Sequence, residues 1–206
     1  MNNIKDKLLR IAPILLIIVI AILAIAALVS LGQAMFGGGQ STQTSDLVDL
    51  SVESLLKTDT SRSVRMTVRG PIVADENFRS YIVEISPNER KLVTYKGYLE
   101  GVIDEVKLEN NTKSYDEFVH ALDKANIMSG KQLENEANDV RGICAGGHTY
   151  DFAILKDGEV EKNLWTSTCD GSPGSLQANV RQLQNLFILQ IPNSSEVVRD
   201  LGVGRN

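Results

Sequence analysis

Residues 150–168 read YDFAILKDGEVEKNLWTST, and this stretch decides the fold class of the chain. Its first half alternates apolar and other side chains, which is the period of a β-strand with one buried face. The apolar members of that alternation are Tyr150, Phe152 and Ile154. Asp157-Gly158 is a strong signal for a two-residue hairpin turn. The sequence therefore predicts an antiparallel pair whose return strand covers about 159–168.

Four further strand signals lie upstream of this hairpin. The first two strands show strict alternation, and their apolar residues are Val64, Met66, Val68, Tyr81, Val83 and Ile85. A third strand is expected at about 92–95 and a fourth at 98–108, interrupted by Gly101. Gly/Pro-rich clusters separate the early strands, as turns between strands require. We therefore expect an antiparallel meander with one solvated face.

Segments with helical periodicity flank these strands. A short helix is expected at 46–57, and Ser114-Tyr-Asp-Glu117 has the form of a capping box that opens a second helix. The apolar face of that second helix is Phe118, Leu122, Ala125 and Met128, before Ser129-Gly130. The apolar positions of a last helix, which Pro192 ends, are Leu176, Val180, Leu183 and Phe187. The order of elements indicates one α+β domain over residues 46–200.

A charge-free run of 21 residues, from Ile11 to Leu31, precedes the domain. As a helix it would measure about 31 Å, enough to cross the hydrocarbon core of a bilayer. Three basic residues lie in segment 1–10, and no Lys or Arg follows the run until Lys57. The positive-inside bias therefore predicts a cytoplasmic N-terminus and an extracytoplasmic domain. Residues 32–45 would form a flexible linker and 201–206 a loose tail.

The apolar run has two other interpretations. A cleaved signal peptide has a shorter apolar core, of about 7–15 residues, and a small-residue cleavage site that Gly32-Gln33-Ala34 matches poorly. The run resembles the N-terminal helix of a pilin in its position. Such helices usually carry a glutamate near their start, and no acidic residue interrupts this run. Ala26, Ser30 and Ala34 are spaced four apart, a pattern that allows two membrane helices to approach closely. A retained single-pass anchor is the preferred interpretation, with self-association through these small residues as a weaker expectation.

Composition excludes some partner classes. The chain has 26 acidic and 21 basic residues; without Asp6 and the three N-terminal bases, 25 and 18 remain, a net charge of −7 for the part beyond the anchor. A nucleic-acid-binding domain shows a basic stripe instead. We therefore expect no nucleic acid as a partner.

Cys144 and Cys169 are the only cysteines, and the predicted topology places both in an oxidising compartment. Pairing around the hairpin turn puts Cys169 opposite position 146. A bulge near Gly146-Gly147 would then bring the two sulfurs together. We expect a disulfide that closes the open end of the hairpin.

An alternative enzymatic interpretation uses the same cysteine. Thr166-Ser-Thr-Cys169, with Arg181 twelve residues later and an upstream His, resembles the sortases. The resemblance implies a transpeptidase in which Cys169 is the nucleophile, His120 the acid/base and Arg181 the oxyanion stabiliser. It covers about four residues and two loose spacings, and a disulfide to Cys144 would remove the nucleophile.

Other candidate sites are weaker. Cys144, Cys169, His148 and His120 would suffice in number for zinc, but they lack the paired spacing of structural zinc sites. We therefore expect no metal and no cofactor. An exposed Trp165 beside Tyr150 would be a candidate contact for a protein partner. Together these features predict a membrane-anchored extracytoplasmic module that is noncatalytic and serves binding or assembly, with the sortase-like enzyme as the alternative.

Overall fold

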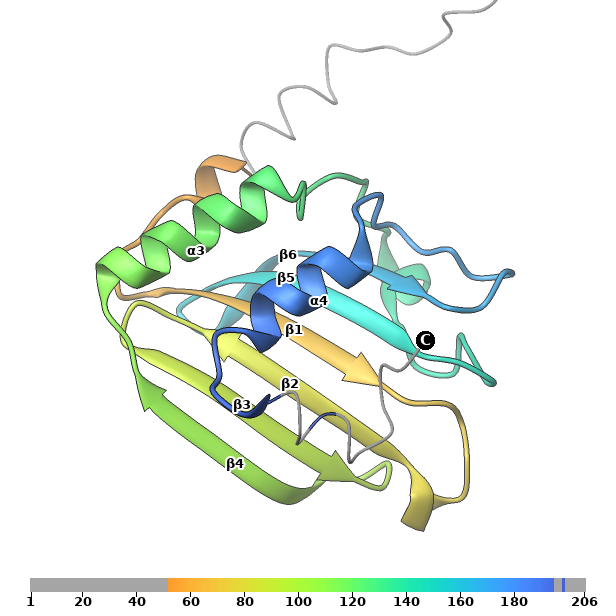
Figure 1. Ribbon diagram of the computed structural model, residues 1–206. Helices are drawn as coiled ribbons and strands as arrows, with labels where there is room; N and C mark the ends of the chain where they lie inside the picture. Colours follow the sequence, from red (N-terminus) through yellow and green to blue (C-terminus); the bar gives the residue numbers. More distant parts are fainter. Residues whose placement is uncertain (1–51, 195–197, 199–206) are drawn as a thin grey trace, which may run out of the picture. The chain divides into compact units, whose positions relative to one another are not determined.

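The computed structural model describes residues 52–194 and 198, which all belong to one compact unit, Asp46–Asn206. A six-stranded antiparallel sheet with the order β4-β3-β2-β1-β5-β6 forms its centre (Figure 1). The strands are β1 (Arg62–Arg69), β2 (Arg79–Ile85), β3 (Glu89–Lys96), β4 (Gly101–Glu109), β5 (Thr149–Lys156) and β6 (Glu159–Ser167). The meander β1–β4 and the hairpin β5–β6 are both present, so the predicted α+β class of the domain is confirmed.

The β5–β6 turn has the predicted form. Asp157 and Gly158 have φ angles of 52° and 82°, the positive values that a type I′ turn requires. Lys156 lies opposite Glu159, but the register shifts between Ile154 and Leu155. This irregularity adds one residue on β6, so the hairpin beyond it pairs one position later than the turn alone predicts.

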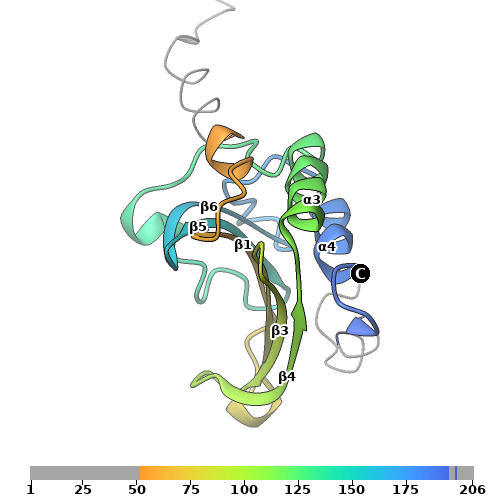
Figure 2. The ribbon, with the colours of Figure 1, turned by 90° about the vertical axis from the view of Figure 1, so that its left-hand side faces the viewer.

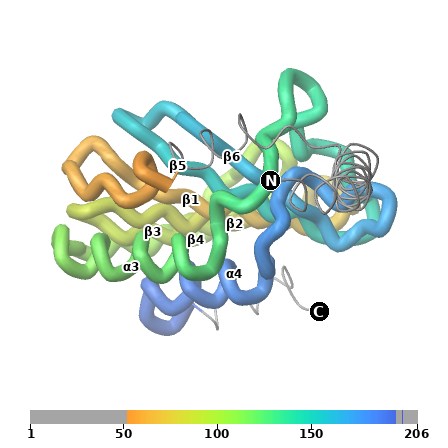
Figure 3. The backbone as a smooth tube through the Cα atoms, turned by 90° about the horizontal axis from the view of Figure 1, so that it is seen from above, coloured from red at the N-terminus to blue at the C-terminus, as the bar shows by residue number. Residues whose placement is uncertain are grey.

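Two helices cover the same face of the sheet. They are α3 (Thr112–Lys124) and α4 (Val180–Ile188), and Figures 2 and 3 show both lying along one side of the strands. Between sheet and helices the ring of Phe187 packs against Phe118 at 5.3 Å and against Phe152 at 5.9 Å. The alternating apolar residues predicted for the strands form this core with the helix residues. One-sided burial explains the period-2 pattern of β1 and β2, whereas on β5 Ala153 and Leu155 of the other face are buried as well.

Both ends of α3 differ from the prediction. The N-cap is Asn111 rather than Ser114, because the Asn111 side chain accepts a hydrogen bond from the Ser114 N–H at 2.9 Å. The helix ends at Lys124, and Asn126 adopts a positive φ of 58°, which breaks the helical path well before Gly130. The expected capping box was therefore wrong in its position.

The other helices also differ from the prediction at their ends. Of the helix expected at 46–57, residues 52–57 are described; 52–55 are helical, and Leu55 is buried. α4 begins after the cap residue Asn179, so Leu176 lies outside it and forms an isolated bridge with Gly130.

Several predictions lie outside the described residues. These are segment 1–10, the anchor from Ile11 to Leu31 with its small residues Ala26, Ser30 and Ala34, the linker 32–45 and the tail 201–206. Within 52–194 and 198, no helix is both long enough and apolar enough to span a bilayer.

Candidate interaction site

Exposed apolar side chains gather where the β1–β2 loop meets the β3–β4 turn. We call them the hairpin-end surface, and its members are Ile72, Val73, Tyr98, Leu99, Val102 and Ile103. Leu99 is the most exposed, with 97% of its surface accessible to solvent. Ile72, Val73, Tyr98 and Leu99 lie in the two loops, and Val102 and Ile103 lie at the start of β4. Single exposed apolar residues are common on proteins, but several in neighbouring segments indicate a place where another surface binds.

Tyr98 joins the two loops into one unit. Its hydroxyl donates to the Val73 carbonyl at 2.7 Å and accepts from the Val73 N–H at 3.1 Å. Its ring stacks on Phe78 with the centroids 4.3 Å apart, and its backbone N–H donates to Asp75 Oδ1 at 2.7 Å. Gly97 permits the turn through its φ of 72°. The hairpin-end surface is therefore held in shape before any partner arrives.

A small cavity adjoins this surface. Its volume is about 220 Å³, and its lining includes Arg69, Ile72, Phe78, Tyr98, Arg141 and Cys144. The Ile72 N–H donates to the Ala145 carbonyl at 2.8 Å, which joins the β1–β2 loop to the segment that carries Cys144. The cavity is thus bounded by aromatic and aliphatic groups with two guanidinium groups beside them.

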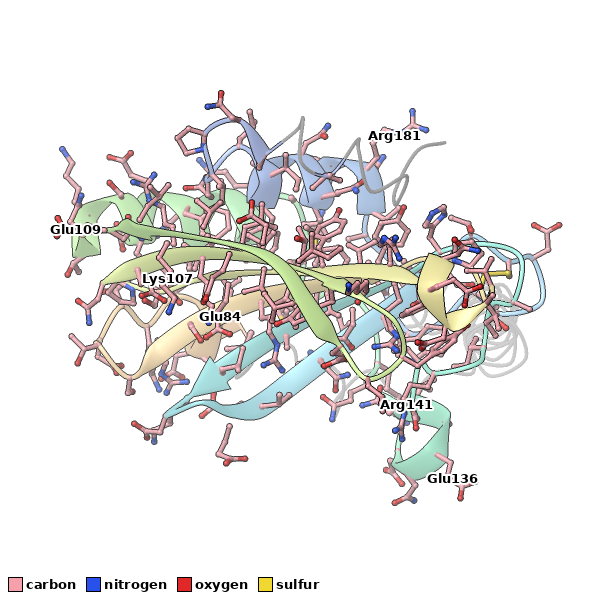
Figure 4. All side chains as sticks on the ribbon, turned by 90° about the horizontal axis from the view of Figure 1, so that it is seen from below. Glu84, Lys107, Glu109, Glu136, Arg141 and Arg181 are labelled. Atoms are coloured by element: carbon pink, nitrogen blue, oxygen red, sulfur yellow. A yellow bond between two sulfur atoms is a disulfide. The ribbon has the colours of Figure 1, made fainter. Side chains whose placement is uncertain are left out.

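Two ion pairs lie beside the cavity. Arg69 bonds Glu100 at 3.2 Å, and its guanidinium lies 5.2 Å from the centre of the Phe78 ring. Arg141, labelled in Figure 4, pairs with Asp139 and lowers the pKa of that carboxyl to about 2. An apolar centre with a charged rim is the usual anatomy of a protein–protein interface.

The predicted disulfide is present. Cys144 and Cys169 are bonded, with their Cα atoms 5.6 Å apart. The close approach of the two segments requires glycine at position 147, because a Cβ there would lie 2.2 Å from Thr168 Oγ1 and 2.9 Å from Cys144 Sγ. The disulfide joins the segment before β5 to the segment after β6, and Cys144 lines the cavity.

The residues of the sortase-like alternative have other contacts. The Cys169 sulfur is bonded to Cys144 and is no thiol in this state. His120 lies on α3, where its Nδ1 is 2.9 Å from the Asp116 carbonyl. Arg181 is exposed in the first turn of α4, and Figure 4 shows it directed away from the sheet.

The four cysteine and histidine residues that would suffice in number for zinc do not form a ligand cluster. Across the described part of the chain, no three His, Cys, Asp or Glu side chains are grouped to hold a metal ion.

The candidate partner contact at Trp165 and Tyr150 requires correction. Each side chain is only 4% exposed. Tyr150 belongs to the core under the helices. Trp165 is covered by the chain that follows β6, where the Ser175 N–H donates to the Trp165 carbonyl at 2.9 Å. Gly174 lies so close that a Cβ there would be 2.8 Å from the Trp165 ring, so neither aromatic offers a surface to a partner.

The hairpin-end surface was missed in the sequence. Two signals were available: Leu99 lies in a turn, and Val102-Ile103 break the alternation at the start of an expected strand. The loop residues Ile72 and Val73 could not be joined to them without the fold, because about 25 residues separate the two loops.

Comparison with known proteins adds no family. No protein-family model matches the chain, and no curated protein matches it.

Proposed function

We propose that this chain is a membrane-anchored extracytoplasmic module that binds a protein partner through the hairpin-end surface. The observation that carries the proposal is the grouping of six exposed apolar residues, Tyr98 among them, beside a cavity whose two arginines form ion pairs. Interfaces of this kind draw most of their affinity from a few apolar or aromatic residues at the centre. Tyr98 and Leu99 have that position here. The role is noncatalytic in this proposal.

The location rests on the sequence. The uncharged run from Ile11 to Leu31 supports a membrane anchor, and the preceding basic residues support a cytoplasmic N-terminus. The disulfide between Cys144 and Cys169 supports an oxidising compartment for the domain. Two independent features thus favour the same side of the membrane.

Site-specific photo-crosslinking in intact cells tests the partner. The full chain would carry benzoylphenylalanine at position 99 or, as the matched control, at position 189, since Leu189 is also an exposed leucine (77%) on another element. We expect an adduct of one defined mass at position 99 and none at 189. Equal adducts at both positions, or none at position 99, would contradict the proposal.

A substitution then measures the contribution of the surface. Leu99→Lys should weaken the binding of the identified partner by about 30-fold, the effect of losing an interface residue worth about 2 kcal/mol. Leu189→Lys should leave the affinity unchanged. If both variants weakened binding equally, the loss of affinity would come from the added charge and not from the hairpin-end surface.

Protease protection tests the orientation. Protease added to intact cells should remove the domain, and lysing the cells first should add no further cleavage. A domain that survives while a surface control is cut would contradict the extracytoplasmic location.

A further inference from the structure

The two edge strands of the sheet have different neighbours. At β6 the N–H groups of Ser175 and Leu176 donate to the Trp165 carbonyl, and the Trp165 N–H donates to Ser175 Oγ. The opposite edge is β4, which has β3 as its single neighbouring strand within the described residues. An unpaired strand edge is a template for another strand. β4 is nine residues long and thus long enough to serve as one.

The direction of the β4 backbone groups follows from two hydrogen bonds. The Asn110 N–H points towards the β3 side, because it donates to the Asn88 carbonyl at 2.9 Å. The Glu105 N–H instead donates to the side chain of Asp104, at 2.9 Å. In an antiparallel pair these directions alternate along the strand. Glu105, Lys107 and Glu109 therefore direct their N–H and C=O groups away from β3. The Glu109 carbonyl accepts from the Arg90 guanidinium at 3.0 Å, so a strand added at this edge would replace that contact and the one between the Glu105 N–H and Asp104.

On the face of the sheet opposite the helices, the positive and negative charges near the β4 edge are unequal in number. Lys107 lies directly opposite Lys91 in the β3–β4 register. Glu105 bonds both, at 3.0 Å to Lys91 and 3.1 Å to Lys107. One carboxylate thus serves two ammonium groups, and Lys107 is the outer one. Figure 4 shows Lys107 and Glu84 on the same side of the sheet, opposite Arg181.

We propose that the β4 edge pairs with the β4 edge of a second copy of this chain, antiparallel and centred on Val106. In this register Glu105 lies opposite the partner subunit's Lys107, and Lys107 lies opposite the partner subunit's Glu105. Each Lys107 then has a carboxylate of its own across the new strand pair. Opposite charges in directly opposed positions stabilise strand pairing.

The neighbouring registers lack this match. Opposed residues in one sheet share a face, so an allowed register moves the centre by one residue. Centring on Glu105 would oppose two glutamates, and centring on Lys107 would oppose two lysines. Like charges in directly opposed positions are destabilising. The order Glu105-Val106-Lys107 therefore selects one register, in which the two sheets become continuous.

The centre of the proposed partner site lies outside this strand pair. Ile72, Val73, Tyr98 and Leu99 are not part of β4, whereas Val102 and Ile103 belong to its first residues. A dimer would display two such sets of residues on one membrane. The failure of either proposal leaves the other standing, because the tests use different residues.

Charge reversal in the full chain, solubilised in detergent and sized by light scattering, tests the inference. The natural chain should dimerise, and Glu105→Lys alone or Lys107→Glu alone should each be monomeric. A mixture of the two variants should form heterodimers, because every opposed pair then joins a Lys and a Glu. The double variant E105K/K107E should dimerise again, since the swap restores complementarity. Circular dichroism would check that each variant is folded.

Two controls locate the contact. Glu159→Lys reverses a charge on the opposite edge strand and should leave the dimer intact. Val106→Cys should form a covalent dimer on oxidation, whereas Val160→Cys on β6 should stay monomeric. A natural chain that is monomeric throughout would overturn the inference. So would a dimer that persists in both single charge variants, because another surface, such as the anchor, would then hold it.

Discussion

Asp151 is a half-buried carboxylate on β5, on the face of the sheet opposite the helices. It accepts a hydrogen bond from Asn163 Nδ2 at 2.8 Å, and Asn163 Oδ1 accepts from Asn138 Nδ2 at 2.7 Å. The three side chains connect the short η2 helix (Asn135–Asn138) to the sheet. Burial raises the pKa of Asp151, although the hydrogen bond from Asn163 and the charge of Arg65 act in the opposite direction. The buried charge therefore has a net cost at neutral pH.

Asp151→Asn should increase the free energy of unfolding at pH 7. The folded state holds the Asp151 proton more tightly than the unfolded state, so this carboxyl destabilises the fold as pH rises above 3.8 and through its raised pKa. Asparagine keeps an acceptor for Asn163 without the charge. The gain over the natural chain should shrink as pH falls and vanish at about pH 3, where Asp151 is protonated in both states. Urea unfolding across this pH range measures it.

A matched control is Asp170→Asn, because Asp170 is exposed in the loop after β6. It should show no such gain at neutral pH. If Asp151→Asn were less stable than the natural chain at pH 7, the attraction of Arg65 for the carboxylate would outweigh its burial, and the direction argued above would be wrong.

At the scale of single elements, the start of α3 shows how two neighbouring polar residues compete for one role. Asn111 has extended dihedral angles (φ −146°, ψ 157°) and its side chain accepts the Ser114 N–H. Ser114 has the sequence spacing of a capping box with Glu117, but it lies inside the first turn. Asn111 therefore satisfies a backbone donor that has no partner within the helix.

Asn111→Ala should destabilise the domain by about 1 kcal/mol, the usual contribution of an N-cap side chain. Ser114→Ala should have a clearly smaller effect, because alanine also favours the helix interior. Thermal or urea unfolding of both variants gives the comparison. A larger loss of unfolding free energy for Ser114→Ala would show that Ser114 is the N-cap, as the sequence pattern indicated.

The elements that the sequence predicted well are those whose signals are local. Alternation marked the strands because one face of the sheet is buried, and Asp157-Gly158 marked the hairpin because both residues adopt positive φ. Helix ends were less predictable, since Asn111 and Ser114 are both good caps and Asn126 breaks the helix without a glycine. The two β-sheet irregularities, near Ile154 and Thr94, have no sequence signal of their own.

The candidate site was less predictable than the fold. The disulfide was expected from the approximate hairpin register, but the irregularity predicted near Gly146-Gly147 was wrong in its position, because the register shifts near Ile154. The burial of Trp165 depends on the chain around Gly174, and no local pattern shows which loop covers the second face of a sheet. The hairpin-end surface likewise forms only when Tyr98 and Val73 meet across the fold.

At the scale of the whole molecule, the Cys144–Cys169 disulfide lies beside the cavity that adjoins the hairpin-end surface. Its cysteines are 25 residues apart in sequence, and it encloses β5, the turn and β6. Cys144 lines the cavity, and the neighbouring Ala145 carbonyl accepts the Ile72 N–H. The bond therefore acts on stability and on the shape of the proposed interface together.

Replacing both cysteines, Cys144→Ala with Cys169→Ala, should lower the free energy of unfolding by about 2–4 kcal/mol, because the unfolded chain regains the entropy of the open loop. Hydrogen exchange should become faster at the Ile72 N–H, since its acceptor segment is then less restrained, while exchange in the α3 helix changes only with global stability. Reduction of the natural chain should reproduce both effects. If the variant lost stability but kept slow exchange at Ile72, the disulfide would stabilise the hairpin alone, and the hairpin-end surface would owe its shape to Tyr98 and Phe78 instead.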